Sequence, residues 1–100
     1  MKLLQVDFPF NGPFGEEMAA VLTGLAESIN QEPGFVWKIW TESEQNKLGG
    51  GIYLFVDQAS AERYLAMHTA RLQQMGIDGI RGRIFDVNPT LTTVNHGPVA

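Results

Sequence analysis

His68 is the side chain best suited by type to acid–base chemistry, because an unperturbed histidine exchanges its proton at a pH of about 6.5. It lies on a helical spacing, four residues after Tyr64 and four before Leu72. A half-buried imidazole in that position could take a proton from a weakly acidic group such as a phenol. A lone histidine on an apolar helical face is also common as a core residue that only packs. Both interpretations stay open.

Asn11 is the second candidate polar group. It follows a predicted strand, where its side-chain amide could hydrogen-bond a substrate carbonyl. The alternative is that Asn11 and Gly12 form a turn, for which local backbone geometry is sufficient reason.

Trp37 and Trp40 offer flat apolar surfaces of the kind that hold a planar aromatic molecule. They lie three positions apart on one predicted strand, so their side chains are expected to face opposite sides of the sheet. One indole should pack under the helices, and the other should line an interior cavity. Plain packing in a dimer core is the alternative, and the sequence does not decide which indole faces inward.

Three further rings are candidates for contact with a ligand: Tyr53, Phe55 and Tyr64. The two tyrosines could each donate a phenolic hydrogen bond inside a pocket. Tyr64 shares the apolar helical stripe with His68, so packing on the sheet is its alternative role.

Several other chemistries lack the residues that they require. The chain has no cysteine, which excludes disulfides, thiolate nucleophiles and cysteine-based metal sites. Its two histidines, His68 and His96, do not have the spacing of paired metal ligands. The glycine run 49–51 precedes a strand rather than a helix, so it is no phosphate-binding loop. We therefore expect neither a metal nor another cofactor.

Hydrophobic periodicity predicts the order strand–helix–strand–strand–helix–strand. Strands are expected at residues 3–8, 35–41, 51–56 and 79–87, and helices at 14–30 and from an N-cap at Asp57 to Met75, with 42–50 as a hairpin loop. With right-handed crossovers this order gives an α+β ferredoxin-like βαββαβ domain over residues 1–88. Its four-stranded antiparallel sheet would carry both helices on one face. Residues 89–100, with two prolines and no clear period, are predicted to form an extended C-terminal arm.

The face of this sheet without helices is predicted to be apolar. In strand 51–56, Ile52, Leu54 and Val56 alternate with Tyr53 and Phe55, so covering one set leaves the other bare. Such a patch favours a homodimer in which two sheets close a dimeric α/β barrel. A ligand pocket at that face is the other explanation, and the two can coexist.

Charge and hydropathy limit the classes of binding partner that this chain is expected to have. The chain of 100 residues carries a net charge of −4 and is 44% hydrophobic, without a basic stripe. This pattern argues against nucleic acid and against an anionic membrane surface. The N-terminal segment is too short and too polar for a signal peptide, and no segment is long enough to span a membrane. We expect a cytoplasmic protein.

A family resemblance extends over nearly the whole chain. It is carried by the stretches FNGPFG (10–15), LAESINQEPGFVWKIWTES (25–43), GGIYLFVD (50–57), HTARL (68–72) and FDVN (85–88). These stretches resemble the YdhR-type monooxygenases of the dimeric α/β-barrel superfamily. That family is similar to cofactor-independent oxygenases that oxidise anthrone-type aromatics. The wider superfamily also holds haem-degrading oxygenases and lactone isomerases.

The resemblance implies a cofactor-independent monooxygenase that acts on a small aromatic or polyketide-like compound in an apolar cavity of a homodimer. His68 and Asn11 would then be the catalytic groups, and the five aromatic rings named above would hold the substrate. A non-catalytic small-molecule-binding dimer, a haem-binding or haem-degrading dimer and an isomerase that uses His68 are the alternatives. The third strand has Tyr53 or Phe55 where a tryptophan is expected in haem-degrading relatives, which argues against haem.

Overall fold

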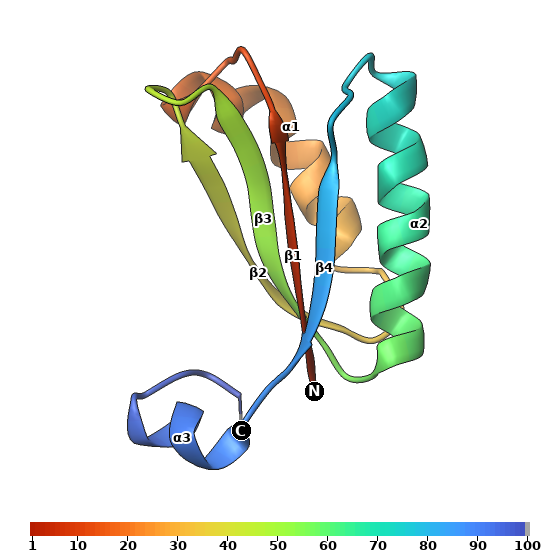
Figure 1. Ribbon diagram of the computed structural model, residues 1–100. Helices are drawn as coiled ribbons and strands as arrows, with labels where there is room; N and C mark the ends of the chain where they lie inside the picture. The colour runs from red at the N-terminus through yellow and green to blue at the C-terminus, as the bar shows by residue number, and fades with distance from the viewer. Residues whose placement is uncertain (100) are drawn as a thin grey trace.

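The structure, a computed structural model, describes residues 1–99 and has the predicted βαββαβ order (Figure 1). The strands are β1 (Lys2–Pro9), β2 (Phe35–Ser43), β3 (Leu48–Phe55) and β4 (Arg81–Asp86), and the helices are α1 (Gly15–Ile29), α2 (Gln58–Gln74) and a short α3 (Pro89–Val94). The strands form one sheet in the order β2-β3-β1-β4, and all its pairings are antiparallel. The predicted ferredoxin-like α+β fold is confirmed.

The two long helices begin in different ways. Asp57 caps α2, as predicted, because its Oδ1 accepts a hydrogen bond of 2.8 Å from the Ser60 amide. No side chain next to α1 caps that helix. Instead the carboxylate of Glu42, on β2, accepts from the Gly15 amide at 3.1 Å. The first turn of α1 is therefore held by the edge strand of the sheet.

The hairpin between β2 and β3 is shorter than predicted. Residues 42–43 and 48–50 belong to the strands, because Glu42 pairs with Gly49 and Ser43 pairs with Leu48. Their polar and glycine-rich character led to the loop assignment. Backbone pairing needs no apolar side chain, however, and only residues 44–47 form the turn.

A β-bulge at Val36 changes which residues of β2 share a face. The pairing register slips by one residue between Phe35 and Trp37, so Val36 has no partner on β3. Strict alternation predicts Phe35 on the same face as Trp37. The bulge places Phe35 instead with Lys38 and Trp40, on the face that carries the helices.

The C-terminal segment is not fully extended, which corrects the prediction for residues 89–94. The Asn88 side chain accepts a hydrogen bond of 3.0 Å from the Leu91 amide, and Pro89 occupies the first turn, so α3 begins there. Figure 1 shows α3 apart from the other helices, beyond the N-terminal end of β1. The segment returns to the sheet at Pro98, whose carbonyl accepts a hydrogen bond of 2.9 Å from the Trp37 indole.

The hydrophobic core lies between the sheet and α2. Gly82 of β4 permits a close approach of α2, since a Cβ there would lie 2.4 Å from Leu65 Cδ1. By contrast, α1 buries only Met18 and Ile29. The buried residues of the core cluster are Leu4, Val6, Phe8, Ile29, Tyr53, Phe55, Ala61, Tyr64 and Leu72. Thus α2 packs tightly on the sheet, whereas α1 stands partly away from it.

The opposite face of the sheet has no helix over it and keeps large apolar side chains at the surface. Ile39 of β2 is 56% exposed and Phe85 of β4 is 42% exposed. Leu91 and Val94 of α3 are exposed as well. None of the helices within residues 1–99 is long and apolar enough to cross a membrane.

Candidate functional site

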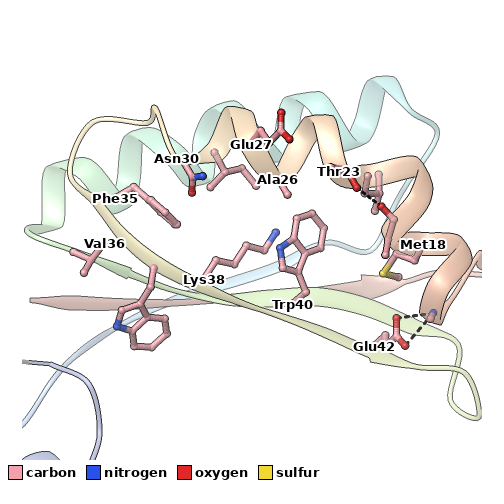
Figure 2. Close-up of a pocket in the computed structure, with 15 residues that line it drawn as sticks. Met18, Thr23, Ala26, Glu27, Asn30, Phe35, Val36, Lys38, Trp40 and Glu42 are labelled. Carbon is pink, nitrogen blue, oxygen red and sulfur yellow. Dashed lines mark hydrogen bonds between the residues drawn. The ribbon is translucent and has the colours of Figure 1, made fainter.

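A cavity lies between α1 and the sheet. Its outer part, of about 690 Å³, is bounded by α1 and β2, and its inner part, of about 260 Å³, extends toward β1, β3 and α2. Met18, Leu22, Lys38 and Trp40 border both parts, so the two adjoin. Figure 2 shows Lys38 and Trp40 projecting from β2 into the space beneath α1. Cavities of roughly 300–1,000 Å³ are typical of sites for small molecules.

The bare face of the sheet, where the sequence favoured a partner or a pocket, carries a smaller hollow of about 200 Å³ whose lining includes Gln5, Asp7 and Ile52. The larger cavity lies on the other face. It opens on the helix side, where β3 carries glycines in place of side chains. A Cβ at Gly51 would lie 2.6 Å from Lys38 Cε, and one at Gly49 would lie 3.2 Å from Phe10 Cδ2. The two glycines therefore leave room for the Lys38 stem and the Phe10 ring.

The inner part of the cavity is mainly apolar. Its polar side chains are Lys38, Thr41, Tyr53 and His68, and no carboxylate of residues 1–99 borders it. Its large apolar side chains are Phe8, Phe10, Met18, Val21, Leu22, Leu25, Trp40, Leu72, Met75 and Ile77. Such a lining suits a flat apolar molecule with one or two polar groups.

Three of the residues singled out in the sequence meet at this inner part: Trp40, Tyr53 and His68. Trp40 is thus the indole on the helix side. Asn11 is exposed, and its side chain has no hydrogen bond within residues 1–99. Its neighbour Gly12 borders the cavity, but Asn11 does not.

The other three aromatic candidates lie elsewhere. Phe55 and Tyr64 are 0% and 2% exposed and belong to the core under α2. Trp37 borders the outer part of the cavity. Its strand partner is Leu54, however, so the indole lies on the opposite face, where it binds the Pro98 carbonyl.

His68 is paired with Arg71 on the same helix. The distance between Arg71 Nη2 and His68 Nδ1 is 2.9 Å. A guanidinium can only donate, so Nδ1 accepts and the proton of the neutral ring is on Nε2. Burial, together with the charges of Arg71 and Lys38, lowers the pKa of His68 to about 3. At neutral pH His68 is therefore an uncharged N–H donor whose only lone pair is already engaged.

Two tyrosines extend this contact toward the sheet. Arg71 Nη2 donates to the Tyr64 hydroxyl at 3.4 Å, and that hydroxyl donates to the Tyr53 hydroxyl at 3.3 Å. Burial raises the pKa of both phenols, so both stay protonated. Because Tyr53 accepts from Tyr64, its own hydroxyl proton is available to a molecule in the cavity.

Lys38 is the polar residue that sequence reasoning missed. Its Nζ lies 3.3 Å from the centroid of the Trp40 ring and 4.6 Å from that of Tyr53. No carboxylate of residues 1–99 lies within 4.0 Å of Nζ. Burial, and then the charge of Arg71, lowers the pKa of Lys38 from 10.5 to about 7. The available signal was the alternation along the strand, which places Lys38 on the same face as Trp40.

The polar groups of the site suit a negative charge rather than a metal cation. Arg71 Nε is buried without a hydrogen-bond partner in the described part of the chain. No three His, Asp or Glu residues gather into a possible metal site anywhere in residues 1–99. Lys38, His68 and Tyr53 can each present an N–H or O–H group to an anion.

Comparison with known proteins identifies the family of this chain and solved structures that share its fold. The family described as "Putative mono-oxygenase ydhR" matches residues 3–98. None of the curated proteins matches the sequence significantly. A solved structure from Deinococcus radiodurans, described as a putative antibiotic biosynthesis monooxygenase, is 13% identical over 88% of this chain and 93% of its own, with a TM-score of 0.62.

A second solved structure is SnoaB, a cofactor-independent oxygenase from Streptomyces nogalater. It is 18% identical over 87% of this chain and 93% of its own, with a TM-score of 0.57. At such identities the two structures establish the shared fold and nothing further.

Proposed function

Because the chain belongs to the ydhR family of mono-oxygenases, we propose that it catalyses the cofactor-independent oxygenation of a small aromatic compound in the cavity between α1 and the sheet. The observation that carries this proposal is the lining of the inner cavity. Trp40 and Phe10 provide flat apolar walls, and Lys38, Tyr53 and His68 provide the few polar groups. SnoaB, which shares the fold, is described as a cofactor-independent oxygenase and supports the same reaction class.

In this reaction the substrate itself supplies the electrons. Loss of a proton from the CH₂ group of an anthrone-type ring leaves a carbanion, which transfers one electron to dioxygen. The resulting radical and superoxide join through a new C–O bond, and a proton converts the peroxide to a hydroperoxide. Loss of the second C–H proton and cleavage of the O–O bond then release water and leave a ketone. The sum, CH₂ + O₂ → C=O + H₂O, balances without an external reductant.

The neutral donors of the site stabilise the charges that arise along this path. The Nε2–H of His68 and the hydroxyl of Tyr53 can hydrogen-bond a substrate oxygen or the peroxide. Both act in an apolar cavity, where such hydrogen bonds are stronger than in water. Asn11, whose neighbour Gly12 borders the cavity, remains a candidate for a contact with the peroxide or a substrate carbonyl.

We also propose that the functional unit is a homodimer formed through the bare face of the sheet. Exposed Ile39 and Phe85 would be buried there, and a domain of 100 residues gains from the additional burial. The exposed Leu91 and Val94 of α3 lie beyond the end of this face and would extend the contact.

Oxygen consumption with dithranol, a hydroxylated anthrone, tests the proposed reaction. The wild type should consume oxygen and form the quinone, whereas His68→Leu should be slower at least tenfold because it lacks the donor. His96→Asn is the matched control, since His96 is exposed and has a φ of 67°, a conformation that Asn tolerates. If aromatic ligands quench the tryptophan fluorescence but no oxygen is consumed, the protein is a binding module. A Soret band on mixing with haem would instead favour the haem alternative.

A further inference from the structure

We propose that Lys38 is the base that takes a proton from the bound compound, and that the site holds the resulting anion. The proposal rests on the proposed function for the oxygenation that follows. The proton transfer itself is a property of the cavity and can be measured without oxygen.

Lys38 is identified as the base by excluding the other polar residues of the inner cavity. The only lone pair of neutral His68 is occupied by Arg71, and the Tyr53 phenol keeps its proton. Thr41 is not a base at neutral pH, and no carboxylate of residues 1–99 borders this part. Among the described residues that line it, the Lys38 amine alone can accept a proton from a ligand.

The surroundings of Lys38 explain why its amine can be uncharged. Arg71, half-buried on α2, adds a like charge, and its Nε has no hydrogen-bond partner within residues 1–99 that would offset it. Glu42 is engaged by the Gly15 amide, and Glu27 lies at the outer part of the cavity. The titratable and charged groups that border the cavity or act on the Lys38 amine are Tyr53 of β3, His68 and Arg71 of α2, Glu27 of α1 and Glu42 of β2.

The proton transfer leaves two charges that the cavity can hold. The Lys38 Nζ lone pair forms a new N–H bond, the C–H or O–H bond of the substrate breaks, and its electron pair stays on the substrate. The new ammonium faces the Trp40 and Tyr53 rings, whose π faces stabilise a cation. The substrate anion remains beside this ammonium and can accept from Tyr53 and His68. The ion pair therefore forms within the cavity, and no carboxylate of residues 1–99 borders its inner part.

This arrangement defines the class of substrate. A flat, mainly apolar molecule fits the walls, and one weakly acidic C–H or O–H group must reach Nζ. A hydroxylated anthrone or a naphthol has both properties. A compound that is already anionic in water, such as a simple carboxylate, has no acidic proton for Lys38 to remove.

Titration of the Lys38 amine is the first test. In protein labelled with ¹³C and ¹⁵N, the Cε and Nζ resonances should titrate near pH 7. They are assigned by their loss in Lys38→Met, and exposed Lys47 is the internal reference. Lys38 resonances that do not titrate below about pH 9 overturn the proposal.

Anaerobic binding of dithranol at about pH 8 is the second test. Wild type should show the absorption of the bound anion without releasing a proton to the solvent, because Lys38 takes it. Lys38→Arg can stabilise the anion but cannot accept a proton, so binding should release about one proton per ligand. Lys38→Met should bind the neutral compound. Dithranol that does not bind to the wild type, that binds as the neutral compound, or that releases one proton on binding overturns the proposal.

Admission of air then separates this proposal from the proposed function. An anion that forms in the wild type but consumes no oxygen refutes the oxygenase and supports the role of Lys38. Equal oxygen consumption by wild type and Lys38→Met supports the oxygenase and refutes that role.

Discussion

Replacement of Lys38 by Met is expected to stabilise the fold at neutral and acidic pH while it removes the amine. In the folded chain the pKa of Lys38 is about 7, against an ordinary value of 10.5. Between these two values the unfolded state binds more protons, so the stability of the wild type rises as the pH increases from 7 toward 10.5. Below pH 7 both states are charged, and the full cost of the buried ammonium is present. Met carries no charge and avoids this cost.

The magnitude follows from the same pKa difference. A fall from 10.5 to about 7 corresponds to at most about 5 kcal/mol, at ~1.4 kcal/mol per pH unit. Lys38 is only half-buried, and the Trp40 ring face favours its charged form, so we take less than half of this, about 2 kcal/mol. In a domain of 100 residues this gain raises Tm by roughly 10 °C.

Thermal unfolding of wild type and Lys38→Met, at one fixed protein concentration, measures this difference. The gain should be greatest at about pH 6 and clearly smaller at about pH 9.5. Lys47→Met is the matched control, because Lys47 is exposed and its loss should change Tm little. A Lys38→Met variant that is less stable than the wild type at about pH 6, or a gain that is the same at every pH, would refute the reasoning.

Three further predictions concern other parts of the molecule. His68 is neutral in the fold because its pKa is lowered to about 3, so the wild type should lose stability as the pH falls below about 6.5. His68→Gln should reduce that dependence of stability on pH by up to ~1.4 kcal/mol per pH unit. A dependence that does not change in the variant would show that His68 is protonated in the fold. Gly51→Ala should weaken dithranol binding at least tenfold in a fluorescence titration, because its Cβ would lie 2.6 Å from Lys38 Cε. Gly24→Ala, with nothing within 4 Å, is its control, and equal affinities of the two variants would contradict the assigned role of Gly51. Ile39→Glu should shift sedimentation from dimer to monomer, and a dimer that persists at low micromolar concentration would show that the bare face is not the interface.

The fold could be predicted from the sequence because its signals are local. The alternation in β1, the apolar run in β3, the helical spacing around His68 and the Asp57 cap each depend on neighbouring residues. The sequence-based predictions fail where the structure depends on pairing between strands. Gly49 looked like part of a loop, yet it pairs with Glu42, and the bulge at Val36 shows only in the register with β3.

The candidate site was only partly predictable, since the cavity depends on how far α1 stands from the sheet. That separation is set partly by the contact of Gly15 with Glu42, which lies far along the chain. A lysine within a strand normally indicates a solvated side chain, so Lys38 was not among the predicted site residues. Alternation did place Lys38 and Trp40 on one face, but only the helix above them turns that face into a pocket.

The strongest reason to regard this cavity as functional is that unfavourable features collect around it. Among the described residues, Lys38 has no carboxylate within 4.0 Å of its Nζ and the Nε of Arg71 is buried without a partner, and His68 is kept uncharged. Gly51 costs backbone entropy in a strand and contributes no packing of its own. Packing alone would favour apolar residues at these positions. Features that each lower stability but together shape and charge one apolar cavity are expected where binding or catalysis requires them.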